Sequence, residues 1–153
     1  MAIDPSMLDA VPLFAGIAEP SRGRLASAAE LVHARGGSVL FEEGEPAEDV
    51  YFLLEGRVAL SLRLPGRSAM TVLSLRPGDL TGWSGILGGP RVATARAVED
   101  ARLLRISGRD LAEICEKDHE LGYRVMCKLA AELARRLHDA RLQLLDVYGE
   151  PGA

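Results

Sequence analysis

A glycine-rich stretch followed by an arginine is the part of the sequence best suited to hold a small anion. Residues 80–97 carry glycines at positions 82, 85, 88 and 89, and Arg91 comes just past them, after Pro90. Glycines allow backbone N–H groups to converge on a phosphate or carboxylate, and an arginine adds a bidentate contact. Taken alone the loop is a weak signal, because strand corners are rich in glycine and an arginine at the start of a strand is often only solvated. Its place after several alternating strands and before a long amphipathic helix makes the prediction of an anion site more specific.

The sequence gives little support for catalysis. It contains no nucleophile elbow, no Walker A loop and no zinc-protease helix motif. The two cysteines, Cys115 and Cys127, are too few for a disulfide framework or a four-thiolate cluster, and the three histidines are scattered. We therefore expect a binding protein that is not an enzyme and holds no metal.

Three blocks of predicted secondary structure must position the glycine-rich stretch. Residues 1–35 are predicted to be helical, with Ser21 as an N-cap and a helix that continues through Val32 to Gly36-Gly37. Between residues 38 and 106 the apolar residues recur with a period of two between glycine and proline corners, which is typical of a β-sandwich or jelly-roll barrel. Residues 107–148 are predicted to be helical again, with N-caps at Ser107 and Asp118. The expected fold is mainly β with flanking helices: a double-stranded β-helix (jelly-roll) barrel followed by a long C-terminal amphipathic helix, in a single domain over residues 1–153.

The long C-terminal helix carries an apolar seam with the spacing of a coiled coil. Its residues follow one another at alternating steps of four and three, which is a heptad pattern: Met126, Ala130, Leu133, Leu137, Ala140, Leu144 and Val147. A second apolar stripe lies on an adjacent face and consists of Leu121, Val125, Leu129 and Leu133. One interpretation is a single wide apolar face packed inside a monomer, since a wide stripe already suits a docked helix. The interpretation that we favour is a homodimer, in which one face packs on the domain and residues 126–147 pair with a second copy.

Composition and charge restrict the partners and the location of the protein. The formal net charge is −4 and the isoelectric point is about 5.4. This acidic balance argues against a surface that coats nucleic acid, because such a surface is basic. No apolar run approaches the roughly 18 residues that a membrane span needs, and the N-terminus shows no secretory signal. We expect a cytoplasmic protein that does not contact membranes.

Three stretches together resemble the cyclic nucleotide-binding domain of the catabolite activator protein and related sensors. Residues 41–58 are similar to the family's glycine-spaced strand pair, residues 82–97 to its phosphate-binding cassette, and residues 134–137 to the middle of its dimerising helix. The resemblance covers nearly the whole chain and implies an eight-stranded jelly roll whose ligand pocket is capped by the last helix. Transcription factors of the family continue into a helix-turn-helix module, which the five residues after Tyr148 cannot form. We therefore expect no DNA binding by this chain alone.

The resemblance assigns roles to single residues of the cassette and reveals two departures. Arg91 matches the arginine that holds the cyclic phosphate, and Gly82 matches the glycine that opens the cassette. Trp83 stands where cyclic-nucleotide binders have a glutamate for the ribose 2′-OH, and Val92 stands where a serine or threonine meets the phosphate. Arg136 lies on the helix where the family offers a further polar contact. The predicted ligand-binding residues are Gly82, Trp83, Ser84, Arg91, Val92 and Arg136.

These departures predict weak binding of cyclic AMP. A hydrogen bond to a charged group is worth about 1.5–3 kcal/mol, so the loss of two weakens binding roughly 10²- to 10⁴-fold. Trp83 either stacks on a different ligand or fills the pocket. We predict a stand-alone sensor or regulatory protein that binds an anionic small ligand, a cyclic nucleotide or another anion, over residues 82–91. The alternative is a degenerate member of the family that has no ligand and acts as a dimeric protein-interaction module.

Overall fold

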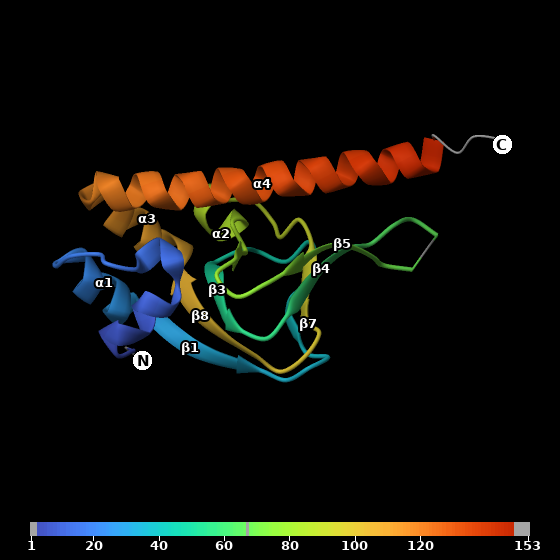
Figure 1. Cartoon of the computed structure of the whole chain (residues 1–153). Helices are drawn as coiled ribbons and strands as arrows, with labels where there is room; N and C mark the ends of the chain where they lie inside the picture. Colours follow the sequence, from blue (N-terminus) through green and yellow to red (C-terminus); the bar gives the residue numbers. More distant parts are fainter. Residues whose placement is uncertain (1–2, 67, 149–153) are drawn as a thin grey trace.

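The computed structural model describes residues 3–66 and 68–148, and of residues 143, 144 and 146–148 it describes the backbone alone. Eight strands form the body of the molecule, with helices on both sides of them in the sequence (Figure 1). The N-terminal elements are η1 (Pro5–Ala10), η2 (Pro12–Phe14) and α1 (Ser21–Ala28). The strands are β1 (Ala29–Ala34), β2 (Val39–Phe41), β3 (Asp49–Glu55), β4 (Val58–Leu62), β5 (Met70–Leu75), β6 (Leu80–Thr81), β7 (Thr94–Ala97) and β8 (Ala101–Ser107). The short helix α2 (Ser84–Leu87) interrupts them, and α3 (Gly108–Lys117) and α4 (His119–Tyr148) follow.

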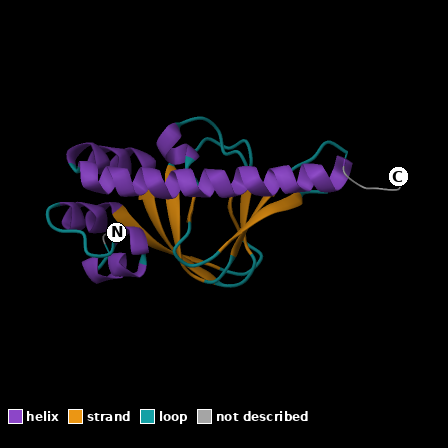
Figure 2. Cartoon of the chain, turned by 45° about the horizontal axis from the view of Figure 1, so that its top comes forward, coloured by secondary structure: helices purple, strands orange, loops and turns teal. Residues whose placement is uncertain are grey.

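The strands make two four-stranded antiparallel sheets. Their orders are β1-β8-β3-β6 and β2-β7-β4-β5, so strands distant in the sequence lie side by side. Two facing sheets of this kind form a jelly roll. The predicted fold class, mainly β with flanking helices and a long C-terminal helix, is confirmed. Figure 2 shows α4 lying across the strands, with most of the other helices gathered at one end.

The core has two compartments that share the strands β3 and β8. In β3 the side chains of Val50 and Phe52 pack toward the helices, whereas Tyr51 and Leu53 pack between the sheets. Successive side chains of a strand point to opposite faces, so burial of both faces explains the continuous apolar run of this strand. In β4 only alternate residues are fully buried, as the period-two pattern predicts for a strand with one wet face.

The structure corrects the prediction that residues 1–35 are helical throughout and that Ser21 is an N-cap, because Pro20 holds the N-cap position and Ser21 is the first residue of α1. Helix α1 ends at Ala28, and residues 29–34 form β1, which pairs with β8 from Ala29 against Ile106 to Ala34 against Ala101. The residues around this boundary are alanine, glutamate and leucine, which favour a helix when isolated. Backbone pairing with a strand far away in the sequence overrides this local preference.

Helix α4 packs on the rest of the domain with one of its two apolar stripes. Leu121, Val125 and Leu129 are buried, and Leu133 is half-buried beside them. The seam residues Met126, Ala130, Leu137 and Ala140 are exposed, whereas the side chains of Leu144 and Val147 lie outside the described part of the chain. The helix begins as predicted, because the Asp118 carboxylate accepts a hydrogen bond of 3.1 Å from the Leu121 N–H.

Candidate functional site

The six residues predicted to bind a ligand lie around one small cavity. Gly82, Trp83 and Ser84 reach it from the turn between β6 and α2, Arg91 and Val92 from the segment before β7, and Arg136 from α4. The remaining walls are Phe41, Leu60, Thr81 and Ala93. The structure thus brings residues from distant parts of the sequence to one place. Their role in ligand binding stays a prediction.

Arg91 is the buried charge of this site. Its side chain and backbone together are only 5% exposed, and its guanidinium donates hydrogen bonds to the Gly82 carbonyl (3.0 Å) and the Asp49 carbonyl (2.8 Å). The guanidinium carbon also lies 4.2 Å from the centre of the Phe41 ring, a cation–π contact. Within the described part of the chain, none of the ion pairs involves Arg91. Burial lowers the pKa of this group, but an arginine stays protonated, so the site contains a buried positive charge held by dipoles and an aromatic face.

Two cassette glycines are required by close backbone approach. A Cβ atom on Gly82 would lie 2.7 Å from Nη1 of Arg91 and 2.9 Å from the Asp49 carbonyl oxygen. A Cβ atom on Gly85 would lie 2.8 Å from that same oxygen. The N–H groups of Gly85 and Ile86 donate within the turn, to the carbonyls of Gly82 and Trp83 at 2.9 Å each. We expected the loop amides to converge on an anion, but at these positions the glycines instead let the turn pack against β3.

Trp83 and Arg136 close the cavity on the side of α4. The Arg136 guanidinium carbon lies 5.5 Å from the centre of the Trp83 indole ring, and Trp83 is half-buried against the apolar core. The pKa of Arg136 is lowered, because the effect of burial outweighs the opposite effect of the nearby Glu132. Val92 is 42% exposed, so it stands at the outer rim of the site. The contact between Trp83 and Arg136 is a direct link between the cassette and the long helix.

The enclosed space beside Arg91 is very small. Its volume is about 10 Å³, which is room for about one water molecule. Pockets that bind small molecules usually measure roughly 300–1,000 Å³. Trp83 and Arg136 would therefore have to move before a nucleotide could enter.

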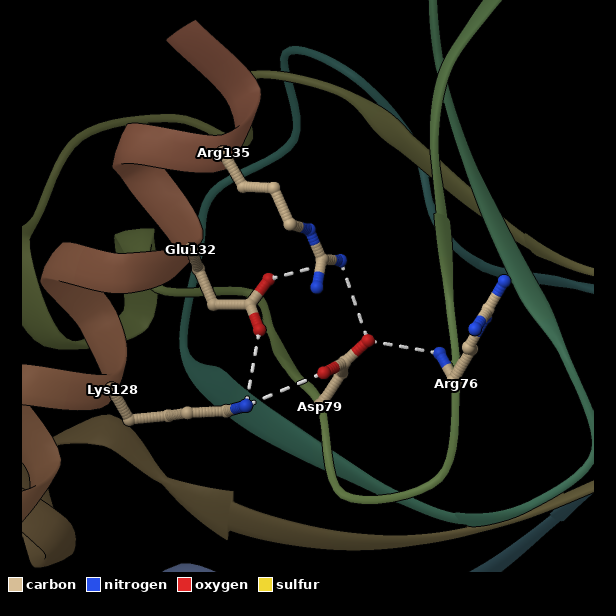
Figure 3. A network of polar contacts seen from close by, with 5 residues as sticks. All are labelled: Arg76, Asp79, Lys128, Glu132 and Arg135. Carbon is tan, nitrogen blue, oxygen red and sulfur yellow. Dashed lines mark hydrogen bonds and ion pairs between the residues drawn. The ribbon is translucent and has the colours of Figure 1, made fainter. Parts of the chain in front are cut away.

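A network of charges beside the site joins α4 to the corner between β5 and β6 (Figure 3). Asp79 accepts hydrogen bonds from Lys128 and Arg135, both at 3.3 Å, and from the Arg76 N–H at 2.9 Å. Glu132 is only 3% exposed and pairs with Lys128 at 3.4 Å. Its other oxygen lies 3.6 Å from Arg135 and has no hydrogen-bond partner among the described residues. Burial and the nearby Asp79 raise the pKa of Glu132, whereas for Asp79 the burial effect is outweighed by the Arg76 N–H and the two cations, so its pKa is lowered.

Sequence reasoning missed several residues around the site. Phe41 belongs to a stretch recognised by resemblance, but nothing in its spacing indicated a contact with Arg91. The charges of the Asp79 network come from segments far apart in the sequence, so no local pattern relates them. Among residues 3–66 and 68–148 no group of acidic, histidine and cysteine side chains is placed to hold a metal ion. Over that same range, no helix has the length and apolar character needed to cross a membrane.

Comparisons with known proteins agree on one family. A sequence profile of the cyclic nucleotide-binding domain matches residues 31–118. The cyclic AMP receptor protein of Thermus thermophilus is 34% identical over 109 residues, which cover 71% of this chain and 49% of that protein. A putative potassium channel protein of Rhodopseudomonas palustris is 30% identical over 149 residues, which cover 95% of this chain and 34% of that protein. The chain thus spans a half or less of these curated relatives.

The same similarity is found among solved structures. A putative cyclic nucleotide-binding protein from Geobacter metallireducens superposes with a TM-score of 0.72 at 31% sequence identity. The match covers 89% of this chain and 99% of that one. The sequence and the fold therefore point to the same family.

Proposed function

We propose that this chain, which belongs to the cyclic nucleotide-binding domain family, is a cytoplasmic sensor of an anionic small molecule that binds cyclic AMP weakly. The observation that carries the proposal is the buried Arg91 guanidinium, which has no carboxylate partner among the described residues. Burial of a charge is costly unless the charge is compensated. A phosphate or carboxylate that reaches Arg91 would supply the missing negative charge.

Weak binding of cyclic AMP follows from the residues that surround Arg91. Trp83 and Val92 lack the oxygen atoms that would meet the ribose and the cyclic phosphate. Trp83 also occupies the space beside Arg91 together with Arg136, which leaves a cavity of about 10 Å³. A ligand with an aromatic or apolar body would fit the surface formed by Trp83 and Val92 better than a ribose would.

The ligand signal would pass to α4 through Arg136. This residue contacts Trp83 of the cassette and sits one residue before Leu137 on the exposed seam of α4. A ligand that displaces Trp83 must change this contact. The helix is therefore the route by which the state of the cassette reaches a partner.

The first test concerns the ligand. Trp83 is the only tryptophan, so its fluorescence reports on the site directly, and we expect no change with cyclic AMP or cyclic GMP up to high micromolar concentration. The double substitution Trp83→Glu with Val92→Ser should restore cyclic AMP binding, measured by calorimetry because the variant lacks the fluorophore. Micromolar or tighter binding of cyclic AMP by the unmodified chain would contradict the proposal.

The second test concerns the anion. Phosphate or sulfate should raise the melting temperature relative to chloride at equal ionic strength, and Arg91→Gln should abolish the rise. Arg96→Gln is the matched control, because Arg96 is exposed and donates to the Gly37 carbonyl at 2.7 Å, away from the cavity. Equal responses of both variants would show that the effect is not specific to Arg91.

A ligand-free dimeric interaction module is the second candidate. The small volume beside Arg91 favours it, because Trp83 and Arg136 already fill the site. Under this alternative no anion changes the stability through Arg91, whereas self-association of α4 remains. The two candidates therefore differ in the anion test and agree on the dimer.

Both candidates include a homodimer through residues 126–147. The supporting observation is the exposed seam, in which Leu137 is 64% and Met126 is 42% exposed on a helix whose other stripe is buried. Sedimentation should give about twice the chain mass of 16.4 kDa. Leu137→Glu should give folded monomers, since Leu137 is mostly exposed in the single chain and is not among the residues that pack against its core. A wild-type chain that stays monomeric at high micromolar concentration would contradict the dimer.

A further inference from the structure

We infer that the groove between α3 and α4 is a socket for the Tyr123 side chain of a second copy of this chain. The inference rests on the proposed pairing of α4 and specifies how that pairing is made. Tyr123 of each copy enters the groove of the other. The seam predicted from the sequence begins at Met126, so it does not include Tyr123 or the part of the groove that α3 forms.

The groove has the size and character to receive an aromatic side chain. Its volume is about 360 Å³, which lies within the range of roughly 300–1,000 Å³ that is usual for pockets that hold a small organic group. Its walls are largely apolar: Ile86 from α2, Leu111, Ala112 and Cys115 from α3, and Gly122, Val125 and Met126 from α4. Glu116 and His119 complete the lining and offer acceptors for a phenol hydroxyl.

The heptad register places Tyr123 on the exposed seam. It lies three residues before Met126, which continues the alternating steps of the seam toward the start of α4. Tyr123 is 73% exposed, which is unusual for a large aromatic side chain on a folded domain. Tyr123 is therefore the residue at the N-terminal end of the seam that a second copy would contact.

The same register matches Tyr123 to the groove. The steps of the seam make Tyr123 an a position of the heptad. In a parallel pair, a knob at an a position enters a hole made by four residues of the facing helix, at the same level, at one and four positions before it, and at three positions after it. For Tyr123 those positions are Tyr123 itself, Gly122, His119 and Met126. Three of these four residues line the groove. The cavity therefore lies where a parallel two-fold partner would insert its tyrosine.

Gly122 gives this hole its depth. A Cβ atom at this position would lie 3.1 Å from the Cys115 carbonyl oxygen, so α3 and α4 approach each other closely there. With no side chain at position 122, the hole opens down to α3, and Cys115 and Ala112 form part of its lining. In a two-fold dimer the same contact occurs twice.

The test measures the dissociation constant of the dimer by sedimentation over a dilution series. Tyr123→Ala should raise the constant roughly 30-fold or more, as expected for a buried aromatic anchor, and Tyr123→Phe should change it less than about threefold, because the ring is kept. Ala112→Leu fills the socket from α3 without altering Tyr123, and should raise the constant about tenfold or more. Leu142→Ala is the control, because Leu142 is 47% exposed on α4 but lies off the seam.

The outcomes separate this inference from the proposed dimer. A dimer that Tyr123→Ala leaves unchanged would overturn the socket and leave the pairing of α4 intact, whereas a monomeric wild type would overturn both. If Tyr123 occupies the socket, Tyr123→Ala and Ala112→Leu remove the same contact. The double variant should then raise the dissociation constant by less than the product of the two single increases. Circular dichroism checks that each variant folds, and if Ala112→Leu does not, the comparison of Tyr123→Ala with Tyr123→Phe decides alone.

Discussion

The positive charge of Arg91 is buried by the fold itself, without a ligand. Two backbone carbonyls and the Phe41 ring hold its guanidinium in place. Dipoles of this kind partly replace the hydration that a buried ion loses, but they do not neutralise it. The carbonyls come from Gly82 and Asp49, so the position of the arginine depends on the turn and on the start of β3. The chemistry of the site is therefore set by backbone geometry as much as by side chains.

At the scale of a residue, Gly82→Ala should destabilise the protein far more than Gly88→Ala. Both glycines have a positive φ, +82° and +91°, so an alanine is strained at either position by about 1–3 kcal/mol. Only at Gly82 would the new methyl group also meet Arg91 and the Asp49 carbonyl, whereas nothing lies within 4 Å at Gly88. Urea denaturation should show a loss of about 3 kcal/mol or more for Gly82→Ala. Similar losses for the two variants would contradict the close approach.

At the scale of an element, α4 is fixed to the domain by two different kinds of contact. Its first half packs through the buried stripe of Leu121, Val125 and Leu129. Its middle is held by the Asp79 network, in which two carboxylates alternate with two cations. Buried ion pairs contribute little net stability but resist displacement, because breaking one leaves an unpaired charge. The network therefore fixes the position of α4 beside Arg136 and Trp83.

Glu132→Gln should leave the protein at least as stable as the wild type at neutral pH. Burial and Asp79 raise the pKa of Glu132 above its usual 4.5, so the folded state binds this proton more tightly than the unfolded state. The favourable contribution of protonated Glu132 is complete below 4.5 and is lost as the pH rises through the folded pKa. Any advantage of glutamine should therefore be largest at pH 7 and shrink as the pH falls toward 4.5.

Urea denaturation at pH 7, 5.5 and 4.5 checks this expectation. Glu120→Gln is the matched control, because Glu120 forms an exposed i,i+4 pair with Arg124 at 3.2 Å, and such pairs contribute little. A loss of more than about 2 kcal/mol for Glu132→Gln at pH 7 would show that its ion pairs outweigh its burial.

At the scale of the whole molecule, the sequence predicts the fold better than the site. The period of two, the glycine and proline corners and the N-caps at Ser107 and Asp118 are local signals, and the structure agrees with them. Strand β1 was missed because its residues prefer a helix until β8 pairs with them. The cassette residues were found by resemblance, but the roles of Phe41, Asp49 and Asp79 depend on contacts between distant segments, which no local pattern encodes.

Also at this scale, we expect the purified chain not to bind DNA in a sequence-selective way. Its formal net charge is −4, and tight DNA binding needs several basic contacts to phosphates. Fluorescence anisotropy with labelled duplexes at low and moderate salt measures this. Retention of one duplex over a scrambled one, weakened by salt, would contradict the expectation.

The pairing of β1 with β8 and of β3 with β8 has a consequence for how the chain acquires its structure. β8 is the last strand in the sequence, yet it lies between β1 and β3 in the first sheet. Closing such long loops costs entropy before the contacts compensate for it, so folding is slower than in proteins with local contacts. On the ribosome, the hairpin of β4 and β5 can form early. In contrast, β1 and β3 cannot join one sheet until β8, which lies between them and ends at Ser107, has been made. The surface on which α4 docks is therefore completed only shortly before α4 itself is made.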